Sequence, residues 1–161
     1  MNKFILVALL FSLSLFAESA RQKFKNEGDK VILLEALKVN EDLHMAFYKY
    51  DAAKVSKFSQ SLKSILEKIK GKEVVKILGR ASKQLEKISK EKSQDQNNKL
   101  YSLVSKSLIS ILAKYDLGKD YNAYSCPMVK MAWVQNSTKI NKVHNPYASY
   151  MPHCGTKDTN Y

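Results

Sequence analysis

The chain has 161 residues, of which 45% are hydrophobic and 26% charged, and its formal net charge is +12. This length suits one domain with a modest core and leaves little room for a second one. The positive charge would fit a nucleic acid or an anionic surface, but it is mostly lysine spread along predicted helices, which is typical of solvated helix faces.

Residues 1–17 have the pattern of a secretory signal peptide. Lys3 provides a positive start, residues 4–16 form an apolar run, and Ala17 or Ala20 supplies a small residue for cleavage. The run is too short for a comfortable membrane span. The sequence therefore predicts an exported protein of the bacterial periplasm, and export removes nucleic acid as a partner.

After a flexible segment at 18–28, residues 29–155 are predicted to form one helical domain. Apolar residues recur there at spacings of three and four, the mark of amphipathic helices. These stripes cover residues 31–48, 55–69, 74–88 and 100–112. Short connections favour antiparallel neighbours, so the expected fold is all-α, an up-down four-helix bundle. The helices carry no catalytic constellation, and a non-enzymatic role is expected.

Single residues predict where these helices begin and end. Asp51 suits the N-cap of the second helix, and Asp95 could cap the fourth. Gly71 is a plausible stop after the second helix, and Gly118 after the fourth. Gly79 lies inside the third helix, where glycine costs about 1 kcal/mol relative to alanine. Close packing against a neighbouring helix would explain it.

The composition changes at residue 118. All three prolines, both cysteines and the only tryptophan lie beyond it, and the helical periodicity is lost. Helix is disfavoured at the residue before each proline. Residues 118–155 are therefore expected to form an irregular C-terminal cap, followed by a tail at 156–161. Its expected supports are a buried tryptophan and a proline-fixed turn: Trp133, Asn145, Pro146 and Tyr147.

Cys126 and Cys154 are the only cysteines, and two interpretations of them stay open. An exported protein meets an oxidising environment, and an even cysteine count fits a structural disulfide. Closing a loop of this length would stabilise the fold by roughly 3–4 kcal/mol in the loop-entropy model.

The second interpretation is a soft-metal site, because thiolate and thioether ligands prefer Cu(I). Met128 is two positions from Cys126, and Met151 is three positions from Cys154. Two loops could thus offer two thiolates and two thioethers to one ion. Other candidate ligands are His153, His144 and Met131. His44 is a lone histidine in the first helix, and no metal role is expected for it.

The C-terminal motifs also resemble those of domain-of-unknown-function family 3347. The residues that carry the resemblance are Cys126-Pro127-Met128, Trp133-Val134-Gln135, Ile140, Asn145-Pro146-Tyr147, Met151 and Cys154-Gly155. The resemblance extends over roughly Leu33 to Gly155. The chain departs from the family pattern at Ala148-Ser149, where the family has an aromatic residue and a glycine.

This resemblance implies an exported bacterial helical domain that also occurs attached to periplasmic adaptors of copper and silver efflux systems. It places the motif positions at Cys126, Met128, Met151 and Cys154. The expected function is then binding or buffering of a soft metal, Cu(I) first, with transfer to an efflux adaptor or another envelope protein. The alternatives are an interaction module held by a Cys126–Cys154 disulfide, and weak attraction of the basic protein to anionic envelope surfaces.

Overall fold

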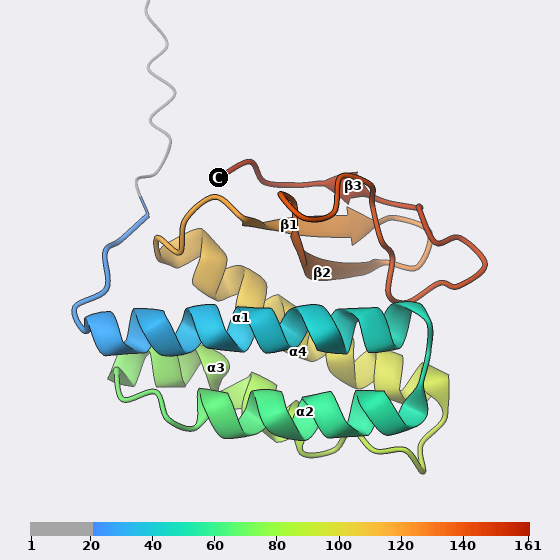
Figure 1. Ribbon diagram of the computed structural model, residues 1–161, viewed down its shortest axis with the longest axis horizontal. Coiled ribbons are helices and arrows are strands. Elements are labelled where there is room, and N and C mark those ends of the chain that lie inside the picture. The colour runs from blue at the N-terminus through green and yellow to red at the C-terminus, as the bar shows by residue number, and fades with distance from the viewer. Residues whose placement is uncertain (1–20) are drawn as a thin grey trace, which may run out of the picture.

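The computed structural model describes residues 21–161, so the predicted signal peptide lies outside the described residues. Four helices contact one another and carry a small three-stranded antiparallel sheet on one side (Figure 1). The helices are α1 (Glu27–Tyr48), α2 (Ala52–Leu66), α3 (Lys72–Leu85) and α4 (Gln94–Lys114). The strands are β1 (Tyr121–Cys126), β2 (Met131–Asn136) and β3 (Thr156–Lys157). The fold is mostly helical, and the all-α prediction is wrong in the C-terminal region.

The helix starts have capping side chains. Asn26 caps α1, and Asp51 caps α2 by accepting from the amide of Lys54, as its sequence position predicted. The predicted cap of α4 is wrong by two residues. Ser93 is the N-cap and forms a capping box with Gln96, whereas Asp95 lies in the first turn.

The backbone that leads into α3 is held by a side chain from another helix. Gly71 is its N-cap and supplies no side chain, and the buried carboxylate of Asp29 accepts from the amides of Lys70 and Gly71 at 3.0 and 2.9 Å. Gly71 therefore begins α3, while α2 has already ended at Leu66. The prediction for Gly79 is wrong, because a methyl group added there would meet nothing within 4 Å.

The helices share one apolar core. Leu33, Leu62 and Leu108 are fully buried in it, on α1, α2 and α4. The ring of Tyr101 stacks on Phe47 with centroids 4.4 Å apart, and its hydroxyl donates to Asn40 Oδ1 at 3.1 Å. These contacts tie α4 to α1 under the sheet.

The N-terminal residues of the described chain lie against the end of α4. The amide of Gln22 donates to the carbonyl of Lys114 at 2.8 Å, and its own carbonyl accepts from the amide of Asp116 at 2.9 Å. Phe24 is buried and stacks on Tyr115 at 4.6 Å. Residues 21–26 are thus held in place by α4.

The predicted irregular cap is in part a sheet, with strand order β2-β1-β3. β1 and β2 form a hairpin in which Tyr121 pairs with Asn136 and Cys126 with Met131. β3 comes from the predicted tail and pairs with β1. The sheet packs on α4 and α1, away from α2 and α3 (Figure 1). None of the helices in residues 21–161 combines the length and the apolar composition needed to cross a membrane.

Candidate functional site

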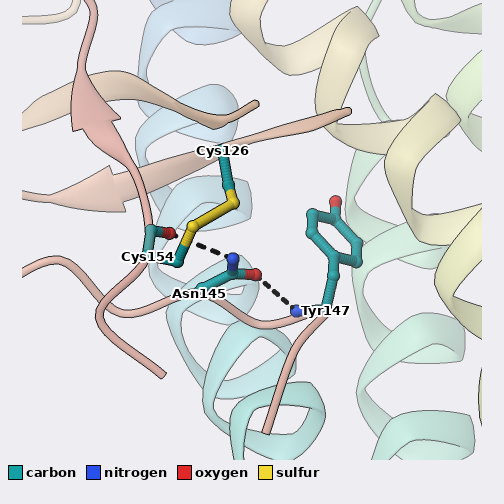
Figure 2. Close-up of a disulfide and its surroundings, with 4 residues drawn as sticks. All are labelled: Cys126, Asn145, Tyr147 and Cys154. Carbon is teal, nitrogen blue, oxygen red and sulfur yellow. Dashed lines mark hydrogen bonds between the residues drawn. A yellow bond between two sulfur atoms is a disulfide. The ribbon is translucent and has the colours of Figure 1, made fainter. Parts of the chain in front are cut away.

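Cys126 and Cys154 form a disulfide (Figure 2). Cys126 ends β1 and is buried, Cys154 lies half-buried in the loop before β3, and their Cα atoms are 5.8 Å apart. In this state neither sulfur is a thiolate, so the pair cannot bind a metal ion as sequence reasoning proposed. The bond indicates an oxidising compartment outside the cytoplasm.

Asn145 organises the loop that carries Cys154. Its side chain is fully buried and bonds on both sides: Nδ2 donates to the Cys154 carbonyl at 3.0 Å, and Oδ1 accepts from the Tyr147 amide at 2.9 Å (Figure 2). Its backbone amide donates to the carbonyl of Pro152 at 2.8 Å. These three bonds close residues 145–154 into a compact loop.

Tyr147 fixes this loop to the rest of the molecule. Its hydroxyl donates to the carbonyl of Ala132 on β2 at 3.2 Å and lies 3.0 Å from Ser105 Oγ on α4. Burial raises the pKa of the Tyr147 phenol well above its ordinary value, so the hydroxyl stays protonated. The preceding Pro146 is also buried, and its peptide bond is trans.

Trp133, on β2, is fully buried. Its ring lies between Tyr124 and Tyr147, with centroids 6.0 and 6.2 Å away. Gly155 approaches it closely: a Cβ on this residue would lie 2.8 Å from the Trp133 ring and 2.7 Å from the Ser125 carbonyl. With φ at +144°, the position also favours glycine.

The three methionines of the cap differ in exposure. Met128 lies in the β1–β2 turn and is 70% exposed. Met151 is half-buried in the loop closed by Asn145, and its carbonyl accepts from the amide of Cys154 at 3.0 Å. Met131 packs against the core opposite Cys126. Cys126, Met131 and Lys130 also line a surface groove of about 380 Å³.

All three histidines of the chain lie in one row. The ring centroids of His44 and His144 are 6.5 Å apart, and those of His144 and His153 are 6.0 Å apart. His144 also stacks on Tyr48 at 4.4 Å. The sequence did not indicate that His44 lies beside His144, because one hundred residues separate the two histidines.

The histidines differ in their environments. His44 is buried, and neither ring nitrogen has a hydrogen-bond partner. Burial, helped by the neighbouring His144, lowers the pKa of His44 to about 3. Burial and then His153 lower the pKa of the half-buried His144. His153 is exposed, and its Nδ1 lies 2.7 Å from the Val143 carbonyl.

Sequence reasoning also missed a polar cluster that joins α1 to the sheet. The carboxylate of Glu41 accepts from the Tyr121 hydroxyl, from Asn136 Nδ2 at 2.9 Å and from Lys139 Nζ at 2.8 Å. Burial opposes ionisation, but the hydrogen bonds from Lys139, Tyr121 and Asn136 outweigh it and lower the pKa of Glu41. The cluster holds the far ends of β1 and β2 against α1.

Within residues 21–161, no group of three or more His, Cys, Asp or Glu side chains is arranged to hold a metal ion. No family model, curated protein or solved structure matches the chain. The function is therefore inferred from the residues and geometry of this chain.

Proposed function

We propose that the domain binds a soft metal ion, Cu(I) first, in the periplasm, and that the Cys126–Cys154 disulfide controls whether the site exists. The observation that carries the proposal is that this bond joins two segments, the end of β1 with its turn and the loop before β3, that each hold a cysteine and a methionine. Thiolate and thioether sulfurs are the ligands that select Cu(I). The motif resemblance of this region to family 3347 points to the same metal.

The site opens only when the disulfide is reduced, and we propose that the reductant is a dithiol of another protein. One of its thiolates attacks a sulfur of the disulfide, its second thiol resolves the mixed disulfide, and the partner leaves oxidised. The domain then carries two thiols. Binding of Cu(I) by both sulfurs releases their two protons.

The two thiols would stay close after reduction. The Cα atoms are 5.8 Å apart, and the backbone on each side is held by other bonds. Cys126 belongs to the β1–β2 ladder, and Asn145 holds the carbonyl of Cys154. A preformed pair of sulfurs lowers the entropy cost of binding an ion.

The thioethers and the groove supply the remaining parts of the site. Met151 shares the loop of Cys154, and the exposed Met128 can meet an ion, or a partner that takes it, at the surface. The groove beside Cys126 gives an ion a path from solvent, and Lys106 and Lys130 in its walls favour a thiolate over a thiol. The receiving partner would be an efflux adaptor or another envelope protein.

The test is competition with a Cu(I) chelator, using reduced and oxidised mature protein. The reduced protein should take one equivalent of Cu(I), and the oxidised protein should bind at least about tenfold more weakly. Cys154→Ser should abolish the difference, and Met151→Leu should weaken binding by the reduced protein. Met45→Leu, on α1, is the matched methionine control and should bind like the wild type. Equal Cu(I) affinity in reduced wild type and Cys154→Ser would falsify the site.

A second candidate is the interaction module, which is favoured by two exposed apolar side chains. Met128 is 70% and Tyr150 is 76% exposed, and both lie on loops that the disulfide joins. The two candidates differ in redox dependence. A surface held in shape by the disulfide should bind an efflux adaptor more weakly after reduction, whereas copper binding should appear only after reduction.

A further inference from the structure

The row of histidines is a group of metal-ligating side chains that the sulfur site does not use. We propose that His144 and His153 bind a divalent ion of the Cu²⁺ or Zn²⁺ class while the disulfide is closed. This inference goes beyond the proposed function, because the ligands are imidazoles instead of sulfurs. The ion is one of intermediate softness instead of the soft Cu(I). It does not depend on the thiols.

The distance between the two rings suits one shared ion. Imidazole nitrogen binds Zn²⁺ at about 2.0–2.1 Å, so two rings on one ion have centroids roughly 5–6 Å apart. The centroids of His144 and His153 are 6.0 Å apart, and their planes are tilted by 40°. The lone pairs lie in the ring planes, so tilted rings can direct them toward one point.

His153 has the hydrogen bond that ligating histidines have. Its Nδ1 lies 2.7 Å from the Val143 carbonyl, an acceptor, so this nitrogen carries the proton and donates. The lone pair is then on Nε2, and the side chain is exposed to solvent. A carbonyl on the second nitrogen also fixes the ring orientation.

His144 is held in place on several sides. Its ring stacks on Tyr48, its backbone amide donates to Gln135 Oε1 at 3.0 Å, and it precedes the loop closed by Asn145. Its Nδ1 is buried without a hydrogen-bond partner. This leaves Nε2 as the nitrogen that can reach an ion beside His153.

His44 supports the pair without binding the ion. Its plane lies within 19° of that of His144, and lone pairs of near-parallel rings do not converge well. It is also only 2% exposed, so an ion would lose most of its water to reach it. Because burial keeps His44 neutral, it places no positive charge behind the site.

Two protein ligands leave the other coordination positions to water. Such a site exchanges its ion readily. The oxidised protein would thus hold a labile divalent ion, while the reduced protein would gain a sulfur site for Cu(I).

The test is a Cu²⁺ titration of tag-free oxidised protein, followed by electron paramagnetic resonance. One equivalent should bind, with hyperfine splitting from two imidazole nitrogens. His153→Gln changes an exposed residue and should keep the fold, yet weaken binding at least tenfold. His144→Gln should also weaken Cu²⁺ binding at least tenfold. Asn141→Ala, in the same loop, is the control and should bind like the wild type.

Equal Cu²⁺ binding by His153→Gln and wild type would overturn the proposal and show an adventitious ion only. A signal from one nitrogen would overturn the shared site. The titration uses only the oxidised protein, so its result is separate from the Cu(I) competition. Failure of the sulfur site would leave this result unchanged, and the reverse is also true.

Discussion

At the scale of single residues, Asn145 holds the backbone of the loop around Cys154. It makes three hydrogen bonds within ten residues, two of them from a side chain with no solvent exposure. The backbone groups that it bonds, the Tyr147 amide and the Cys154 carbonyl, have no helix or strand to satisfy them at that point.

Asn145→Ala should therefore destabilise the protein. The change leaves a buried amide and a carbonyl without partners, which costs roughly 2–4 kcal/mol in total. Urea unfolding of the oxidised protein measures this loss. Asn141→Ala, at an exposed asparagine earlier in the connection between β2 and β3, should change stability by less than about 0.5 kcal/mol. Similar losses in both variants would contradict the role given to Asn145.

His44 gives the protein a pH dependence that can be measured. Its pKa is about 3 when folded and near 6.5 when unfolded, so the unfolded chain binds more protons as the pH falls. The contribution of His44 to the unfolding free energy is fully present above about pH 6.5. It is lost progressively as the pH falls from there toward 3. Between pH 7.5 and 5, His44 should account for a loss of about 2 kcal/mol, and His144 adds to it in the same direction.

His44→Leu removes the larger of these two contributions. The difference in unfolding free energy between pH 7.5 and pH 5 should shrink by about 2 kcal/mol, because leucine does not titrate. Carboxylates remain mostly ionised over this range and change little. Urea unfolding at the two pH values is the measurement, and an unchanged difference would show that His44 is not the buried titrating group.

At the scale of elements, the helices could be predicted and the sheet could not. The helices have apolar stripes of the correct period, and Asp51 acts only on nearby backbone, so local sequence contains the information. β1 is buried at five of its six positions, so both of its faces are covered. Such a strand lacks the alternation of polar and apolar residues that identifies a half-buried strand.

The site was predictable only in part for the same reason. With two cysteines in the chain, Cys154 is the one intramolecular partner that Cys126 could have, but the sequence left a disulfide and a metal site both open. The row of histidines joins α1 to a loop one hundred residues later, and Asp29 on α1 binds the backbone amides of Lys70 and Gly71, just before α3. Contacts of this kind depend on how the elements pack, which no local pattern records.

Gly79 is a position where helix propensity alone should decide the effect of a substitution, because no neighbouring residue packs against it. It lies inside α3 with free space around its Cα, so Gly79→Ala should stabilise the protein by about 0.5–1 kcal/mol. Thermal unfolding measures the gain. Gly71→Ala is the matched comparison and should destabilise, because its Cβ would lie 2.6 Å from the Asp29 carboxylate. A loss of stability in Gly79→Ala would mean that α3 has a neighbour at this position.

At the scale of the whole molecule, the disulfide joins the sheet to its long loop but not to the helical core. Its reduction should lower the unfolding free energy by roughly 3–4 kcal/mol, the loop-closure contribution for 28 residues of separation. The helices, Asn145 and Tyr147 keep their contacts without it. Near-ultraviolet circular dichroism should show a folded reduced protein, and loss of that signal would leave no preformed pair of thiols.

The most direct test of the proposed function is the Cu(I) affinity of one protein sample before and after reduction, measured against the same chelator. We expect one equivalent of tight Cu(I) binding in the reduced protein, at least about tenfold weaker binding once the disulfide forms again, and no such change in Cys154→Ser. Affinity that is the same in the oxidised and reduced protein would contradict a sulfur site controlled by Cys126 and Cys154.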